Sequence, residues 1–216
     1  EASTLERDLA RRDFTVNAMA IDVRTYEKYV NAKVRKGKVK VIDPFNGQQD
    51  LKDKILRTPL EPDKTFSDDP LRMMRGVRFA CQLNFSIDPG TLESIHKNRE
   101  RLKIVSAERA QEELCEFLSY KEPSISLILM FQTGLLDIIL PEVSALDGVE
   151  EVYGHQHKNN LVHTFKVVDN IAERSDKILL RLAGLFHDIG KASTKKFVPK
   201  IGWTFYQHEH VGKKLV

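Results

Sequence analysis

The chain has 216 residues, of which 41% are hydrophobic and 30% are charged, a balance typical of a folded globular protein. The formal net charge of +3 is too small to indicate a nucleic-acid binder by itself. The chain holds 2 cysteines, Cys81 and Cys115, which are too few for a disulfide framework and predict a reduced, cytoplasmic setting. The most apolar window, residues 125–140, is too short and too interrupted to span a membrane.

The first third of the chain predicts a small amount of β-structure. Residues 15–23 alternate polar and apolar side chains, which indicates a strand, and residues 39–42 indicate another. Between them, residues 33–40 carry five cations and no acid. This basic run either neutralises phosphates or is a solvated hairpin that turns at Gly37.

Beyond residue 60 the apolar residues recur at helical spacing. Asp69-Pro70 is typical of a helix start, with Asp as the N-cap and Pro at the first helical position. Pro89-Gly90 predicts a break, Ser106 a cap, and Gly134 a late interruption. The helices expected are 71–83, 91–101, 107–119, 124–136 and two beyond residue 161, the last two following a polar linker at 145–160. The predicted fold class is therefore mainly α, with a small β remnant at the N-terminus.

Arg11, Arg12, Asp13 and Asn17 stand together at the start of the first predicted strand. Guanidinium groups bind phosphate oxygens in a bidentate manner, and Asp13 and Asn17 could bond to a sugar or position the arginines. A surface cluster of ion pairs is the competing, and commoner, explanation.

Asp69 and Arg72 lie three residues apart, so their side chains can share one helix face. An aspartate accepts hydrogen bonds, whereas an arginine only donates them. Cytosine and adenine both present an amine beside a ring-nitrogen acceptor, which such a pair complements; uracil and guanine reverse that order. The alternative is an N-cap followed by an intrahelical ion pair. Arg75 and Arg78 continue the basic ridge.

Four segments, in order, resemble the class II tRNA nucleotidyltransferases (CCA-adding enzymes) and the bacterial poly(A) polymerases. RRDFTVNAMA is similar to the family's RRDFxxNA motif, and Asp43, Pro44, Gly47, Asp50 and Leu51 match its D-P-x-x-G-x-x-D-L segment. FSDDPLRMMRGVRFACQLNFSID and SAERAQEELCEFL resemble the next two motifs. The resemblance covers roughly residues 7–142.

The resemblance implies roles for individual residues. Arg12, Asp13 and Asn17 match positions that contact the phosphates and sugar of the nucleotide, and Asp69 and Arg72 match the pair that reads the incoming base. Arg109 and Glu113 match a helix that braces this pocket. The family holds Mg²⁺ on an Asp-x-Asp pair that follows a Gly-rich motif. Because no such pair precedes Arg11, we expect these 216 residues to be a fragment that lacks the catalytic carboxylates and is inactive in nucleotide transfer.

A second group of residues predicts a metal site. His163, the adjacent His187 and Asp188, and His208 fall on successive apolar helices, and imidazole with carboxylate suits a transition metal. The segments around them resemble the start of an HD phosphohydrolase domain. A cluster of structural histidines is the alternative, and His155 and His157 are interpreted as linker residues.

These observations predict three regions: a head remnant at 1–60, a helical neck and body at 61–145, and a truncated HD domain at 146–216. The predicted function is addition of C and A to the 3′ end of tRNA from CTP and ATP. The alternatives are a poly(A) polymerase, which uses ATP only, and a metal-dependent HD phosphohydrolase whose front half binds RNA or nucleotide.

Overall fold

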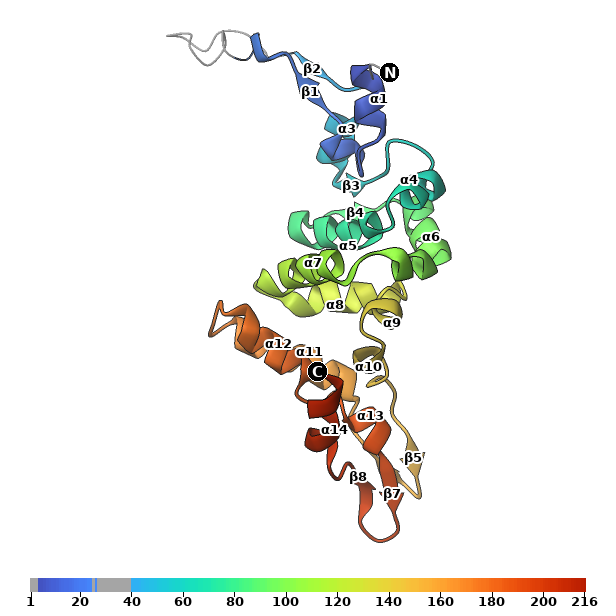
Figure 1. Ribbon diagram of the computed structural model, residues 1–216, viewed down its shortest axis with the longest axis vertical. Helices are drawn as coiled ribbons and strands as arrows, with labels where there is room; N and C mark the ends of the chain where they lie inside the picture. The colour runs from blue at the N-terminus through green and yellow to red at the C-terminus, as the bar shows by residue number, and fades with distance from the viewer. Residues whose placement is uncertain (1–3, 25, 27–39) are drawn as a thin grey trace. The chain divides into compact units, whose positions relative to one another are not determined.

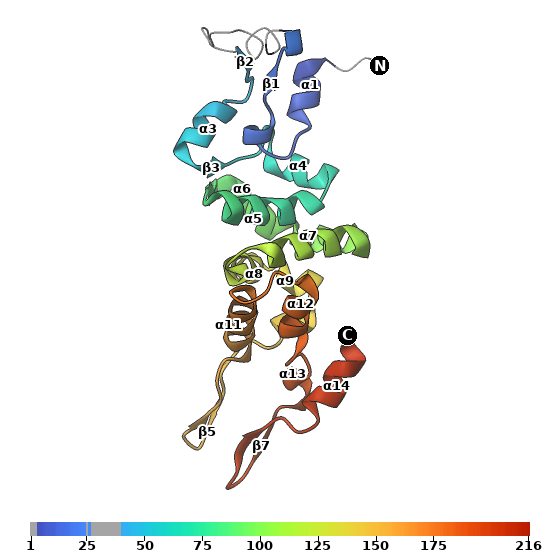
Figure 2. The same ribbon diagram turned by 90° about the vertical axis from the view of Figure 1, so that its left-hand side faces the viewer.

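The computed structural model describes residues 4–24, 26 and 40–216. The chain forms two compact units, Glu1–Asn98 and Arg99–Val216, and both are mostly helical (Figures 1 and 2). The mainly α fold class is therefore confirmed. Cys81 and Cys115 form no disulfide. Among the residues described, none of the helices combines the length and apolar character that crossing a bilayer requires. The basic run at 33–40 lies outside the described residues except for Lys40.

The first unit is built from short helices and two strand pairs. The strands β1 and β2 pair antiparallel with Ala20 opposite Ile42, and β3 and β4 pair parallel with Ile55 opposite Ser86. In chain order its elements are α1 (Leu5–Ala10), the 3-10 helix η1 (Thr15–Asn17), β1 (Ala20–Ile21), β2 (Val41–Ile42), α3 (Gly47–Asp53), β3 (Ile55–Leu56), α4 (Pro62–Asp68), α5 (Leu71–Leu83), β4 (Ser86–Ile87) and α6 (Pro89–Asn98).

The prediction of a strand over residues 15–23 is wrong for most of its length. Thr15–Asn17 forms η1, and only Ala20–Ile21 is extended and paired. The cause is Asp13, whose Oδ1 accepts hydrogen bonds from the Phe14 N–H at 2.9 Å and from Asn17 Nδ2 at 3.1 Å. The chain therefore turns around this carboxylate instead of running straight, since Asp side chains bond readily to the nearby chain.

The D-P-x-x-G-x-x-D-L segment has a structural explanation. Asp43 accepts the backbone N–H groups of Gly47 and Gln48 at 2.7 and 2.9 Å and so caps α3. Gly47 is required because an added Cβ would lie 2.2 Å from the Thr15 carbonyl oxygen. Asp50, which is buried, accepts the Thr15 hydroxyl at 2.7 Å. The Gly47 and Asp50 contacts lock α3 against η1, and the Asp43 cap fixes the start of α3.

Helix α5 covers 71–83 as predicted, and the Asp69 carboxylate accepts the Leu71 N–H at 3.2 Å. The predicted break at Pro89-Gly90 is wrong, because Pro89 begins α6 instead. The Asp88 carboxylate accepts the Thr91 N–H at 3.1 Å. Asp88 is therefore the cap of α6 and Pro89 its first residue, the same arrangement that was predicted for Asp69 and Pro70 at the start of α5. Helix α6 ends at Asn98 and a 3-10 turn follows.

Asp63 links α4 to α6, and we expect this link to make the protein sensitive to acid. Its carboxylate accepts hydrogen bonds from Ser94, Asn98 and Lys97, and the Lys97 hydrogen bond, followed by the Ser94 bond, lowers the pKa of Asp63 to about 2 from 3.8. Because the folded-state pKa lies below the unfolded value, the stabilisation is present above about pH 4 and is lost as the pH falls toward 2. An NMR titration should show the pKa of Asp63 returning toward its ordinary value in Lys97→Ala. Lys64→Ala, which keeps all three donors, should leave it low; an unchanged pKa in Lys97→Ala would contradict the assignment.

The second unit is helical with two hairpins. In chain order its elements are the 3-10 helix η2 (Arg99–Ile104), α7 (Ala107–Ser119), α8 (Pro123–Gln132), α9 (Leu136–Ile139), α10 (Pro141–Ser144), β5 (Glu151–Val152), β6 (His155–Gln156), α11 (Asn160–Ala172), α12 (Ile178–Phe186), α13 (Lys191–Thr194), β7 (Lys196–Val198), β8 (Gly202–Thr204) and α14 (His208–Leu215). Helix α7 has the predicted bounds. The helix predicted over 124–136 ends at Gln132, because Gly134 adopts a left-handed backbone with φ 72°.

The interpretation of residues 145–160 as a plain linker is wrong. Residues 151–156 form the antiparallel hairpin β5–β6, with Val152 opposite His155. A second hairpin, β7–β8, pairs Phe197 with Trp203. The indole N–H of Trp203 donates to the His155 carbonyl at 3.0 Å and so joins the two hairpins. The β-structure is therefore not confined to the N-terminus.

Candidate nucleotide-binding and metal-binding sites

In the first unit, two of the predicted residues, Asn17 and Arg75, bond to the buried carboxylate of Asp13. Its Oδ2 accepts two hydrogen bonds from Arg75, at 2.9 Å from Nε and 2.6 Å from Nη2, while Oδ1 accepts from Phe14 and Asn17. Asp13 therefore anchors Arg75 on α5 to the RRDF segment by a charge-assisted pair in which two arginine N–H groups donate to one carboxylate oxygen. Its oxygens already serve the protein, which favours a positioning role over direct contact with a sugar.

Arg72 is held by backbone carbonyls. Its Nη2 donates to the Arg11 carbonyl at 2.7 Å and its Nη1 to the Thr65 carbonyl at 3.3 Å. Two of the five guanidinium N–H groups are thus used within the described chain, and three remain for a ligand. Asp69 lies one helical turn earlier, and its carboxylate bonds to the Leu71 N–H. This last contact is the helix cap that the alternative explanation predicts.

The remaining predicted residues are more dispersed. Arg12 is exposed and pairs with Asp8 at 3.4 Å, which matches the competing explanation of a surface ion pair. Arg109 and Glu113 stand one turn apart on α7 in the second unit, with Glu113 buried. Arg78 stacks over the ring of Phe79 at 4.4 Å, and Arg75 lies 5.1 Å from the same ring.

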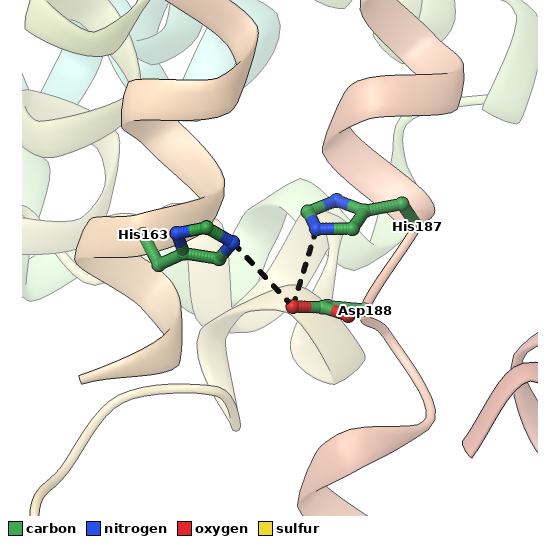
Figure 3. A group of neighbouring side chains, drawn as sticks. All are labelled: His163, His187 and Asp188. Carbon is green, nitrogen blue, oxygen red and sulfur yellow. Dashed lines mark ion pairs between the residues drawn. The ribbon is translucent and has the colours of Figure 1, made fainter. Parts of the chain in front are cut away.

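In the second unit, the HD residues converge. His163 on α11, His187 directly after α12, and Asp188 each offer a ligand atom, and these atoms all lie within 4.8 Å of one another. His187 Nε2 and His163 Nε2 lie 3.2 and 3.9 Å from the same Asp188 oxygen, Oδ2 (Figure 3). Ligand atoms that share an ion at about 2.1 Å are themselves ~3 Å apart, so small side-chain movements would complete the geometry.

The tautomers of two histidines suit metal binding. His187 Nδ1 lies 2.7 Å from the Gly184 carbonyl, and His208 Nδ1 lies 2.9 Å from the Phe205 carbonyl. A carbonyl only accepts, so each Nδ1 carries a proton, and in the neutral imidazole this leaves Nε2 with the lone pair that a metal needs. Fixing the tautomer through a second partner is the usual arrangement for a metal-binding imidazole.

His208 approaches the site from the opposite side of Asp188. Its Nε2 lies 3.6 Å from Oδ1, the oxygen that does not face His163 and His187. Gly190 permits this approach, because a Cβ there would lie 2.1 Å from the His208 carbonyl oxygen at the start of α14. The structure thus brings His208 to Asp188, beside the group of three and not within it.

Lys191 is a residue of this site that the sequence did not single out. Its ammonium lies 2.7 Å from Asp188 Oδ2, so it competes with a metal ion for that oxygen and can swing away on its flexible stem. The only signal in the sequence was its position three residues after the HD pair. The donor set of two imidazoles and one buried carboxylate otherwise fits Zn, Mn, Fe or Ni.

Comparison with known proteins finds family matches along both units of the chain. Three family models match successive segments: a poly(A) polymerase head domain at residues 1–57, a probable RNA- and SrmB-binding site of polymerase A at 84–146, and an HD domain at 159–216. A multifunctional CCA protein of Pseudomonas fluorescens is 34% identical over 99% of this chain and 49% of its own length. The chain thus spans about half the length of such relatives.

Solved structures agree with these matches. The Bacillus stearothermophilus CCA-adding enzyme in complex with CTP is 37% identical, with a TM-score of 0.53 over 62% of this chain and 30% of that one. A tRNA nucleotidyltransferase complexed with a primer tRNA and an incoming ATP analogue is 28% identical, with a TM-score of 0.59 over 86% of this chain and 51% of that one. Together with the converging HD residues and the ordered motifs of the first unit, these matches show that the chain is similar to the tRNA nucleotidyltransferases and poly(A) polymerases over its successive segments, the last of which matches an HD domain.

Proposed function

We propose that this protein adds C and A to the 3′ end of tRNA from CTP and ATP, with Asp69 and Arg72 reading the incoming base. The observation that carries the proposal is the fixed position of Arg72. Carbonyls from two segments hold its guanidinium, which leaves N–H groups that can donate to a ring nitrogen of cytosine or adenine. The names of the relatives support the same activity.

Asp13, Asn17 and Arg75 would act as positioning residues in this proposal. The Asp13–Arg75 pair fixes α5, which carries Arg72, against the RRDF segment. Arg12, exposed at the same segment, would contact the phosphates. Arg109 and Glu113, one turn apart on α7, keep the supporting role that the family resemblance implies. Transfer in this family depends on a metal, for which we propose Mg²⁺; we assign no residue of the chain to it. The proposed setting is the cytoplasm, where thiols such as Cys115 stay reduced.

The division into a head remnant at 1–60, a neck and body at 61–145, and an HD domain from 146 remains our proposal. It is supported by the order of the three matched segments, although the two compact units divide at residue 98.

The proposal is tested by offering the protein, at its full natural length, a tRNA without its CCA end and each nucleotide separately. CTP and ATP should be incorporated and UTP and GTP rejected. Incorporation of ATP alone, in repeats, would instead identify a poly(A) polymerase.

Variants of the base-reading pair should change this choice of nucleotide. Arg72→Ala or Asp69→Ala removes one half of the complementary edge and leaves the other half unpaired, at a cost of about 1–3 kcal/mol. We therefore expect roughly tenfold to hundredfold loss of discrimination against UTP and GTP, measured as ratios of kcat/KM. Arg78→Ala is the matched control on the same helix and should keep the choice. If both variants lost only thermal stability, Asp69 would be a helix cap and no more.

A second activity is supported by the HD residues: metal-dependent hydrolysis of a phosphate ester. A bound metal would supply an activated water and polarise the phosphoryl group. His163, His187 and Asp188 would hold it, with His208 as the fourth ligand. Lys191 would then be free to neutralise a phosphate oxygen.

A further inference from the structure

We propose that the two hairpins of the second unit form a stacking platform that binds the single-stranded 3′-terminal nucleotides of RNA beside the HD site. The aromatic platform consists of Tyr153, His157, Phe197, Trp203 and Phe205. The inference rests on the proposed action on RNA, and it concerns residues that the nucleotide-transfer site does not use.

The platform is a continuous set of rings. Trp203 contacts Phe197 at 5.5 Å and His157 at 5.1 Å between ring centroids, both near-perpendicular. Tyr153 and Phe205 extend the set at its two ends, each about 6 Å from its neighbour. These rings are exposed or half-buried, although a small hairpin core would gain most by burying them. Aromatic rings at a surface offer nucleobases a face on which to stack.

Tyr153 is the most informative member. Its side chain is 89% exposed, and its backbone has φ 50° in the two-residue turn between β5 and β6. Gly154 follows with φ 78°, which is the pattern of a type I′ turn, where Asn-Gly is preferred. A positive φ is energetically costly for a bulky residue, and burial of the ring does not offset this cost because the ring is exposed. Such strain is typical of positions kept for a ligand.

The charges around the platform suit a polyanion. Lys195 lies 5.5 Å from the ring of Trp203 and pairs with Glu150 at 2.7 Å. Lys191 lies 5.6 Å from the ring of Phe205 and pairs with Asp188. Lys196 and Lys200 are exposed on β7 and the turn that follows it. Rings interleaved with ammonium groups are the combination that binds single-stranded nucleic acid. An apolar protein partner would gain nothing from these cations.

The platform is physically continuous with the HD site. Lys191 faces the Phe205 ring and also bonds to Asp188, and the Phe205 carbonyl fixes the tautomer of His208. A base stacked on these rings would therefore leave its phosphate near the histidines. This juxtaposition points to the terminal nucleotides of an RNA strand as the occupant.

The test uses the intrinsic fluorescence of Trp203, because the chain contains only 1 tryptophan. Titration of the full chain with a single-stranded RNA hexamer should quench the emission in a saturable manner. Inorganic polyphosphate and a blunt RNA duplex should not. Equal quenching by polyphosphate would show that charge alone is recognised and would overturn the proposal, as would equal binding of the duplex.

Tyr153→Asn separates binding from folding. Asn suits the turn better than Tyr does, so the melting temperature should hold or rise, while removal of one stacking ring should weaken binding of the hexamer about tenfold. Unchanged affinity would overturn the proposal.

Replacing Lys196 and Lys200 by alanine should make the slope of log affinity against log salt shallower by about 1.4. The charge-matched control pair is Lys166, exposed on α11, and Lys177, exposed directly before α12.

The same variants distinguish this inference from the proposed function. If the protein extends tRNA but the hexamer leaves Trp203 unquenched, the platform is refuted and the nucleotide-transfer function stands. If the protein extends no tRNA but the hexamer quenches Trp203 and Tyr153→Asn weakens the binding about tenfold, the platform stands without that function.

Discussion

Replacing both His187 and Asp188 by alanine is expected to remove the transition metal from the second unit. The two residues supply a carboxylate oxygen and an imidazole nitrogen that lie 3.2 Å apart, and loss of even an outer partner of a metal ligand costs about 10–100-fold in affinity. Loss of two direct ligands should therefore weaken binding by more than about 100-fold. The measurement is elemental analysis after dialysis against a buffered metal solution, and phosphoesterase activity should fall with the metal content.

His210→Ala is the matched control for this experiment. His210 is exposed on α14, two residues beyond His208, and its loss should leave the metal content unchanged. His208→Ala decides whether His208 is the fourth ligand, since this variant should resemble the double variant if His208 binds the ion and the control if it does not. Equal metal content in the double variant and the unaltered protein would remove the site from this region.

The sequence predicted helices well where the signal is local. The bounds of α5 and α7 match the expected 71–83 and 107–119, because apolar spacing and caps are read within a few residues. The strand expected at 15–23 failed because Asp13, which lies just before it, turns the chain by accepting hydrogen bonds from the Phe14 N–H and from Asn17. No alternation of side chains records such a contact.

The residues of the candidate sites also differ in how well the sequence predicted them. The HD pair is adjacent in sequence, and the helical spacing was enough to predict that His163 and His208 approach it. The role of Arg75 as the ion-pair partner of Asp13 was not predicted, since only the fold brings α5 to the RRDF segment. The hairpins were missed because their strands are two or three residues long, although Tyr153-Gly154 gave a turn signal.

Arg181 is the clearest residue that sequence reasoning missed, and its loss should be the most destabilising change in the second unit. It stands within the apolar segment ILLRLAGLF of α12, and its side chain is 2% exposed. Its guanidinium donates to the carbonyls of Leu118 and Tyr120 at the end of α7, and to those of Ala172 and Ser175 at the end of α11. One buried cation thus caps the negative ends of two helices at once.

We expect Arg181→Leu to lower the free energy of unfolding by roughly 3–5 kcal/mol, because several buried carbonyls lose their donors at about 1–3 kcal/mol each. Burial of the leucine side chain cannot compensate for this loss, since the carbonyls belong to the backbone and remain polar. Arg181→Lys should recover only part of the loss, because a single ammonium lacks the planar fork that reaches both helix ends. The measurement is urea unfolding followed by circular dichroism, with Arg174→Leu as the control: Arg174 is exposed, and its replacement should change stability by less than about 0.5 kcal/mol. If Arg181→Leu unfolded at the same urea concentration as that control, the carbonyls would have other donors, and the helix ends would not depend on this residue.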